Sequence, residues 1–229
     1  MSEYGSQVKE LVPISMNTHD QNEKRPRGRP RSFDRGAALD AAVLVFWERG
    51  YDGASVEMLT NAMGISRPSL YSTFGNKREL FVQAIDRYAV TYGSRAFSAF
   101  RVETDGRKAV EGFLDASIEC AVGEGTPRGC LINTVATDAA ENDDELRHKL
   151  SEMFSRTDSA IAERLAASQD GGSPALSDPE RMAQMAHSVT HSIMTRARAG
   201  AGRNELVEIA DAFMMVLFPE PHDNSAVRE

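Results

Sequence analysis

Residues 55–74 read SVEMLTNAMGISRPSLYSTF, and this stretch decides the fold. Its spacing predicts two short helices that meet at a glycine turn. Ser55 is a good N-cap for the first helix, and Gly64 supplies a permissive backbone after it. Ser66 caps the second helix, and Pro68 stands in its first turn, where a missing N–H costs nothing. We therefore expect a helix-turn-helix at about residues 55–74.

The second helix of this pair has an inward and an outward face. Leu70 and Phe74 lie four residues apart and anchor the helix to a core. A short polar helix that a tight turn holds at an angle fits the major groove of DNA. The stretch therefore predicts DNA binding through the outward or sideways positions Arg67, Ser69, Tyr71, Ser72 and Thr73.

Charge is distributed unevenly along the chain. The 229 residues carry a net charge of −8, which by itself argues against nucleic-acid binding. Residues 24–80, however, hold ten Lys/Arg and six Asp/Glu, net +4, whereas residues 81–229 hold fifteen and twenty-four, net −9. A basic segment followed by an acidic body is expected when one small domain meets DNA and the rest has another task.

Composition and hydropathy indicate the compartment. Hydrophobic residues make up 41% of the chain, but no apolar run approaches the roughly 20 residues of a membrane span. The apolar stretch at residues 11–14 is far too short for a signal peptide. Two cysteines, Cys120 and Cys130, do not make a disulfide scaffold. We expect a cytoplasmic protein with no membrane partner, in which both cysteines are thiols.

Helical periodicity runs through most of the chain, and no strand-like alternation interrupts it. Residues 1–31 are expected to be disordered, with a basic arm at 24–31 whose Gly and Pro forbid a helix. A DNA-binding domain is expected at 32–92 and a second helical domain at 93–229. The pattern predicts an all-α fold of about nine helices. Besides the helix-turn-helix, they cover about 35–50, 76–92, 105–122, 130–141, 143–168, 178–199 and 204–218.

Short motifs in the first domain resemble the tetracycline-repressor (TetR) family of bacterial one-component transcriptional regulators. The resemblance covers about 60 residues, from Phe33 to about Tyr92. At two places the chain departs from the family pattern: Met63 replaces the usual alanine, and Arg67-Pro68 replaces a small residue. Residues 127–132 and 196–200 look like one large subgroup of the family. The motifs that match in order and spacing are Phe46-Trp47, Gly50-Tyr51, Ser55-Val56, Ala62-Met63-Gly64-Ile65-Ser66, Leu70-Tyr71 with Phe74, and Lys77-Arg78-Glu79-Leu80-Phe81.

The resemblance implies an assembly as well as a fold. It implies an Ω-shaped homodimer in which residues 93–229 form a ligand-binding and dimerisation domain. The last two long helices would pair into a four-helix bundle across the two-fold axis. The residues assigned to that dimer interface are Met182, Met185, Val189, Ile193, Leu206 and Phe213.

The resemblance also assigns roles at the double-stranded DNA operator. Tyr71 and Lys77 look like phosphate clamps, and the hydroxyls of Ser55 and Thr73 add phosphate bonds, which fix register without reading sequence. Arg67 is the outward residue able to bond guanine bidentately. An alternative for Tyr71 is a half-buried structural residue. The DNA-binding candidates here are Ser55, Ser66, Arg67, Pro68, Ser69, Tyr71, Ser72, Thr73 and Lys77.

The basic arm is a second candidate for DNA contact. The segment Arg27-Gly28-Arg29-Pro30-Arg31 resembles the core of an AT-hook. An extended backbone without a side chain at Gly28 fits a narrow A/T minor groove, where Arg27, Arg29 and Arg31 would meet enhanced negative potential. The alternative is a solvated basic tail that reads no sequence.

A regulator of this kind needs an input, which in the family is a small-molecule effector among the central helices. Small-molecule pockets are mostly apolar with a few polar groups. For each candidate taken singly, an ordinary core position is an equally good interpretation. The candidates are Phe97, Phe100, Phe113, Ser117, Cys120, Asn133, Thr137, Met153 and Phe154.

Cys130 is the candidate for a thiol-based input. It follows Gly129 at an expected helix N-terminus and lies two residues from Arg128, and both features would lower the pKa of its thiol. The position also looks like the reactive cysteine of electrophile- and hypochlorite-sensing family members, with Cys120 as a resolving thiol. The alternative is a small buried apolar residue.

Two histidines and the rival functions complete the sequence-based hypotheses. His187 and His191 have a spacing that can chelate a metal, but no third ligand is apparent, so we predict no metal and no cofactor. The chain lacks a phosphate-cradling loop, a nucleophile elbow and a zinc motif, so we expect no enzyme. The main hypothesis is a repressor that binds a pseudo-palindromic operator as a dimer. The alternatives are an oxidant or electrophile sensor, an activator, and a sequence-neutral architectural DNA-binding protein.

Overall fold

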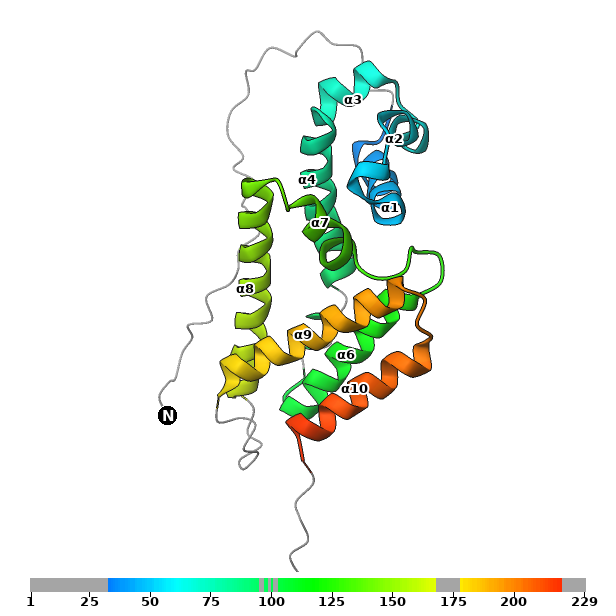
Figure 1. Ribbon diagram of the computed structural model, residues 1–229. Coiled ribbons are helices and arrows are strands. Elements are labelled where there is room, and N and C mark those ends of the chain that lie inside the picture. The colour runs from blue at the N-terminus through cyan, green and yellow to red at the C-terminus, as the bar shows by residue number, and fades with distance from the viewer. Residues whose placement is uncertain (1–32, 95–96, 99, 101–102, 168–177, 220–229) are drawn as a thin grey trace, which may run out of the picture. The chain divides into compact units, whose positions relative to one another are not determined.

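The computed structural model describes residues 33–94, 97–98, 100, 103–167 and 178–219, which are all-helical (Figure 1). This confirms the predicted fold class, while Arg27, Arg29 and Arg31 of the basic arm lie outside the described residues. Residues from Phe33 onward belong to one compact unit. In chain order the helices are α1 (Arg35–Gly53), α2 (Val56–Met63), α3 (Arg67–Phe74), α4 (Lys77–Tyr88), η1 (Ala89–Gly93), α6 (Gly106–Val122), η2 (Leu131–Ala136), α7 (Thr137–Ala139), α8 (Asp144–Ala167), α9 (Pro179–Arg198) and α10 (Arg203–Leu217).

The helix-turn-helix forms where the sequence predicts it. The Ser55 Oγ accepts the Met58 N–H at 3.1 Å and starts α2, and the Ser66 Oγ accepts the Ser69 N–H at 3.3 Å and starts α3. Gly64 ends α2 in the left-handed conformation, with φ 64° and ψ 30°. Any other residue would be strained there, so the glycine fixes the angle between α2 and α3.

Helix α1, before this motif, is longer than predicted, and helix α4, after it, begins with a capping box. Helix α1 does not end at Gly50 but continues to Gly53 across a kink, because Gly50 adopts φ 76° and ψ 171°. Helix α4 begins with a capping box, in which the Asn76 side chain accepts the Glu79 N–H at 2.9 Å and Glu79 accepts the Asn76 N–H at 2.8 Å. The capping box fixes where α4 begins, directly after the turn that follows α3.

Two segments predicted as ordinary α-helix are wider π-helical turns instead. Helix α4 gives way to η1 at Ala89, and the helix expected at 130–141 is η2 followed by the short α7. Gly129 lies just before η2 with a φ of 83°, and a Cβ there would meet the Met194 carbonyl of α9 at 2.9 Å, so the glycine lets the chain pass close to α9. π-Turns are frequent at functional sites, and both of these border the cavity described below.

The helices pack as two groups that share a core. Helices α1–α4 pack against one another, and α6, α8 and α10 pack around α9. Segment η2 contacts α1, α4 and α9 and so joins the groups. Arg198 of α9 donates to the carbonyl oxygens of Trp47 at 2.7 Å and Glu48 at 3.3 Å, just before the kink in α1. None of the described helices is long and apolar enough to span a membrane.

Candidate functional site

Helix α3 presents most of its DNA-binding candidates to solvent. Leu70 and Phe74 are buried and face the core, whereas the Tyr71 side chain is 52% exposed. This face can therefore enter a groove without rearrangement of the core. Ser55, Ser66, Arg67, Pro68 and Ser72 are exposed, and Ser69, Thr73 and Lys77 are half-buried.

The polar groups on this face hold weak local contacts that DNA can replace. The Arg67 guanidinium lies 3.8 Å from the Glu57 carboxylate, and both side chains are more than half exposed. Such a pair contributes little to stability. The Ser72 hydroxyl donates to the Ser69 carbonyl at 3.2 Å, so its oxygen lone pairs face outward. Arg67 is thus the strongest hydrogen-bond donor that α3 offers to a base edge.

Lys77 is already oriented by the end of α1. Its Nζ lies 4.6 Å from the centre of the Tyr51 ring and donates to the Asp52 carbonyl at 3.5 Å. This cation–π contact fixes the ammonium beside the N-terminus of α4, whose dipole also favours an anion. A phosphate bound there would therefore contact both the Lys77 ammonium and the positive end of the α4 dipole.

Gln83 holds the end of α3 in place, and sequence reasoning missed it. Its amide donates to the carbonyl of Phe74, the last residue of α3, at 2.8 Å and to that of Glu79 at 3.0 Å. Its Oε1 accepts a 2.6 Å hydrogen bond from Arg35 of α1. One side chain thus joins α1, α3 and α4. A glutamine among polar helix residues carries no sequence signal for this role, because Arg35 and Phe74 become its neighbours only in the fold.

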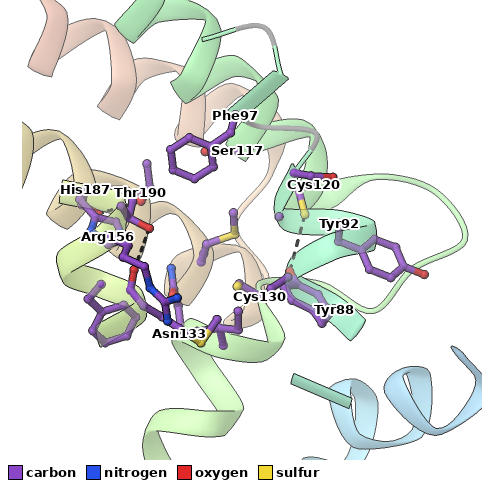
Figure 2. A pocket seen from close by; sticks show the side chains of 18 of the residues that line it. Tyr88, Tyr92, Phe97, Ser117, Cys120, Cys130, Asn133, Arg156, His187 and Thr190 are labelled. Atoms are coloured by element: carbon purple, nitrogen blue, oxygen red, sulfur yellow. Dashed lines mark hydrogen bonds between the residues drawn. The ribbon is translucent and has the colours of Figure 1, made fainter. Parts of the chain in front are cut away.

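A cavity of about 920 Å³ lies among α4, η1, α6, η2, α8 and α9 (Figure 2). Phe97, Phe113, Ser117, Cys120, Asn133, Met153 and Phe154, all candidates from the sequence, line it. Two other candidates do not. Phe100 is buried beside Phe97 and Phe113, and Thr137 lines a smaller neighbouring pocket between α7 and α8. The cavity also takes in residues that sequence reasoning missed, among them Tyr88, Arg156, His187, Thr190 and Met194.

Cys130 lines the cavity, but its surroundings do not activate it. The expectation of a lowered pKa is wrong: burial raises the pKa of the Cys130 thiol, and hydrogen bonds with Tyr88 and the Asn133 backbone offset this only in part. The guanidinium of Arg128 instead donates to the Ala197 carbonyl at 2.8 Å and to the Ala201 carbonyl. Because Arg128 is turned toward the end of α9, its guanidinium is held by backbone carbonyls rather than by a thiolate at Cys130.

We expect Cys130 to react slowly with iodoacetamide at neutral pH. A raised pKa lowers the thiolate fraction, and the side chain is only 7% exposed. Mass spectrometry of the native protein should show labelling at least about tenfold slower than after unfolding. Cys120→Ser isolates the Cys130 signal. Rapid labelling of native Cys130 would contradict the packing interpretation and restore the thiol-sensor alternative.

Two histidines of α9 form a chain of hydrogen-bonded side chains next to the cavity. The His187 Nδ1 lies 2.6 Å from Asp158 of α8, and the His187 Nε2 lies 3.2 Å from the His191 Nε2. Burial, with His187 beside it, lowers the pKa of His191 to about 4. His191 is therefore neutral at physiological pH. Over the described ranges, no three His, Cys, Asp or Glu side chains converge as a metal site would require.

The residues assigned to a dimer interface divide into two groups. Ile193, Leu206 and Phe213 are buried in the core of their own chain, so they present no surface to a partner. Met182 and Val189 are half-buried, and Met185 is exposed. Sequence reasoning missed Met215 and Val216 of α10, which are 72% and 68% exposed. Helices α9 and α10 contact each other and run in opposite directions (Figure 1), so Met185 and these two residues lie toward the same end of the pair.

Comparison with known families matches both groups of helices. Residues 38–84 match the family described as "Bacterial regulatory proteins, tetR family". Residues 106–213 match the domain described as "Tetracyclin repressor-like, C-terminal domain". The first match spans the helix-turn-helix and most of α4, and the second spans the helices that supply most of the cavity lining.

Individual proteins are similar over most of their length. The HTH-type transcriptional repressor ComR of Escherichia coli (strain K12) is 30% identical over 199 residues, 86% of this chain and 94% of ComR. A solved structure of a cysteine mutant of the TetR family transcriptional regulator CifR, complexed with 26bp double-strand operator DNA, has a TM-score of 0.76 and 31% identity. It covers 84% of this chain and 100% of the CifR chain. The HTH-type transcriptional activator FasR of Mycolicibacterium smegmatis is 37% identical over 116 residues, 46% of this chain and 53% of FasR.

Proposed function

This chain belongs to the TetR family of bacterial regulatory proteins, and we propose that it is a cytoplasmic repressor that releases its operator when a small molecule fills the cavity. It is a DNA-binding transcriptional regulator. Repression is supported by the likeness to ComR, which covers most of both chains, whereas the likeness to the activator FasR covers about half of each. The single observation that carries operator binding is the exposed polar face of α3 between capped ends.

The proposed contacts fall into two classes. Tyr71 and Lys77, with the hydroxyls of Ser55 and Thr73, hold phosphates, while Arg67 reads guanine and Pro68 meets a thymine methyl. Ser66, Ser69 and Ser72 complete the face that approaches the bases. Two copies on a two-fold axis read half-sites about 34 Å apart or somewhat more. The arginines Arg27, Arg29 and Arg31 are proposed to follow the adjacent minor groove.

Fluorescence anisotropy on DNA from the upstream region of the gene tests this function. We expect a preference of about 10³-fold or more over random DNA, and a salt slope near −7 if a dimer neutralises about eight phosphates. Arg67→Met should cost about 1–3 kcal/mol on the operator and much less on random DNA. Tyr71→Phe is the matched phosphate-contact variant and should weaken both. Equal affinity for operator and random DNA would instead identify an architectural protein.

The cavity is the proposed input because α4 borders both sites. Its first residue, Lys77, follows the recognition helix, and its last residue, Tyr88, lines the cavity. A ligand that displaces Tyr88 therefore acts on α4, the helix that follows α3 in the chain. A hundredfold loss of operator affinity requires a ligand that prefers the released state by about 2.7 kcal/mol.

A homodimer through the end of the α9–α10 pair is proposed from the exposed apolar side chains there. We expect Val216→Glu to shift the protein from dimer toward monomer in analytical ultracentrifugation, because a charge would be buried against its symmetry mate. Operator affinity should fall at the same time. Val90→Glu places the same charge at a side chain that is also 68% exposed, but on η1, and should leave the dimer intact. An unchanged dimer in Val216→Glu would remove this face from the interface.

A further inference from the structure

The charged groups that line the cavity are not equally neutralised. Asp86 lies 2.6 Å from the Lys149 ammonium, and His187 lies 2.6 Å from Asp158. Arg156 differs from both. Its Nε donates to the Glu152 carbonyl of its own helix at 3.2 Å, and the Glu152 carboxylate is 4.0 Å away on the same exposed face. A pair at that separation in solvent holds the guanidinium weakly. Within the described part of the lining, Arg156 is the cation available to a ligand.

The hydroxyl groups of the lining restrict where an anion can bind. Ser117 donates to the Phe113 carbonyl at 2.7 Å, Thr157 to that of Met153 at 3.1 Å, and Thr190 to that of His187 at 2.7 Å. Each proton is used within its helix, so these oxygens face the cavity as acceptors. Acceptors repel an anion. The Arg156 guanidinium and the Asn133 amide, by contrast, offer N–H donors to an anion.

The Arg156 side chain lies across the cavity from the Tyr88 side chain (Figure 2). Figure 2 shows Arg156, Asn133, His187 and Thr190 on one side and Tyr88 and Cys120 on the other. Six apolar side chains also line the cavity, so a ligand held at Arg156 can place an apolar body against them. The apolar lining is Phe97, Phe113, Ile132, Met153, Phe154 and Met194.

From the Arg156 guanidinium and the apolar side chains of the same lining we propose that the effector is an organic monocarboxylate with an aryl or alkyl body, bound through Arg156. The inference rests on the proposed function, in which the cavity holds the effector. A guanidinium matches the two oxygens of a carboxylate with two parallel hydrogen bonds. One available cation offsets one negative charge, which favours a monoanion over a dianion. Asn133 adds an amide donor, and the aromatic and thioether groups receive the body.

Two fluorescent probes of nearly identical shape test the proposal on the full-length protein: 2-naphthylacetate and 2-(2-naphthyl)ethanol. We expect the acid to bind about three- to fivefold more tightly than the alcohol, because the Arg156 side chain is 73% exposed and solvent screens its ion pairs. Arg156→Met should reduce the affinity for the acid to that for the alcohol and leave the alcohol unchanged. Arg156→Lys should bind the acid more tightly than the alcohol, but with a smaller preference than the wild-type protein. Glu152→Gln removes the carboxylate that competes weakly with the ligand for Arg156. It should raise the affinity for the acid and leave the affinity for the alcohol unchanged.

Each other outcome overturns the proposal. Equal binding of acid and alcohol, binding of neither, or an Arg156→Met protein that still prefers the acid would each exclude Arg156 as the anion site. Operator affinity is measured for every variant without a probe. Failure of the wild-type protein to prefer an operator would refute the proposed function independently, whereas a normal operator preference with no preference for the acid refutes only the ligand class.

Discussion

Replacing Gly75 with alanine is expected to destabilise the protein by about 2–3 kcal/mol, since the residue has φ 81° and ψ −152°, a region that is essentially restricted to glycine. The new Cβ would also overlap the Glu79 carboxylate and displace it from the capping box of α4. For a chain of this size the change should lower the Tm by about 4–12 °C. Operator affinity should fall with it, because Gly75 joins the recognition helix to α4.

Gly112→Ala is the matched control for this prediction. Gly112 lies inside α6, and an added Cβ would have no neighbour within 4 Å. Alanine there should raise stability by about 0.5–1 kcal/mol through the lower entropy of the unfolded chain and leave operator binding unchanged. Differential scanning calorimetry and anisotropy on both variants separate the local strain from the general effect of the substitution. A Gly75→Ala protein as stable as the wild type would show that the α3–α4 turn can relax.

Local signals explain why the helix-turn-helix was predictable from sequence. Ser55, Ser66 and Asn76 are capping residues, and Gly64 needs a left-handed backbone, so each boundary is specified by a few neighbouring residues. Burial also follows from spacing, as Leu70 and Phe74 show. Family resemblance added the roles that spacing alone does not provide. The inferences about helix boundaries and burial depend on interactions within about one turn of helix.

Long-range contacts explain what was not predictable. The side-chain amide of Gln83 has partners in three helices, and the backbone carbonyls that turn Arg128 away from Cys130 come close to it only once α9 is placed. The expectation for Cys130 assumed an ordinary helix N-terminus with a cation beside it. The fold supplies a π-turn and a buried thiol instead, which reverses the direction of the pKa shift. Sequence spacing describes one helix at a time and contains neither fact.

An ion pair between α4 and the start of α8 is the basis of the second prediction with a large expected effect. The Arg78 guanidinium donates to both oxygens of Asp143 at 2.5 and 2.8 Å and to Glu145 at 2.9 Å. The Asp143 carboxylate also accepts the Leu146 N–H at 3.0 Å and so caps α8. Arg78 is next to Lys77 at the start of α4, while α8 farther along lines the cavity. The ion pair therefore connects the beginning of α8 to the region that holds the recognition helix.

Asp143→Asn should weaken this connection without removing the cap, because asparagine is an equally good N-cap. We expect a loss of about 1–2 kcal/mol in the free energy of unfolding at neutral pH, allowing for partial exposure of the pair. Asp143→Ala should lose about 1 kcal/mol more, since it removes the cap as well. Glu145→Gln is the control at an exposed carboxylate and should cost less than about 0.5 kcal/mol.

The pH dependence identifies the charge as the cause. The hydrogen bonds from Arg78, with the Leu146 N–H, lower the pKa of Asp143 to about 2, whereas an unfolded aspartate titrates near about 3.9. The folded state therefore binds the proton less readily. The stabilisation is fully present above about pH 4 and is lost as the pH falls through about 2. Urea unfolding across this range should show a wild-type advantage over Asp143→Asn that disappears in acid. An advantage that persists in acid would assign the effect to packing, and α4 and α8 would then be held together by something other than this ion pair.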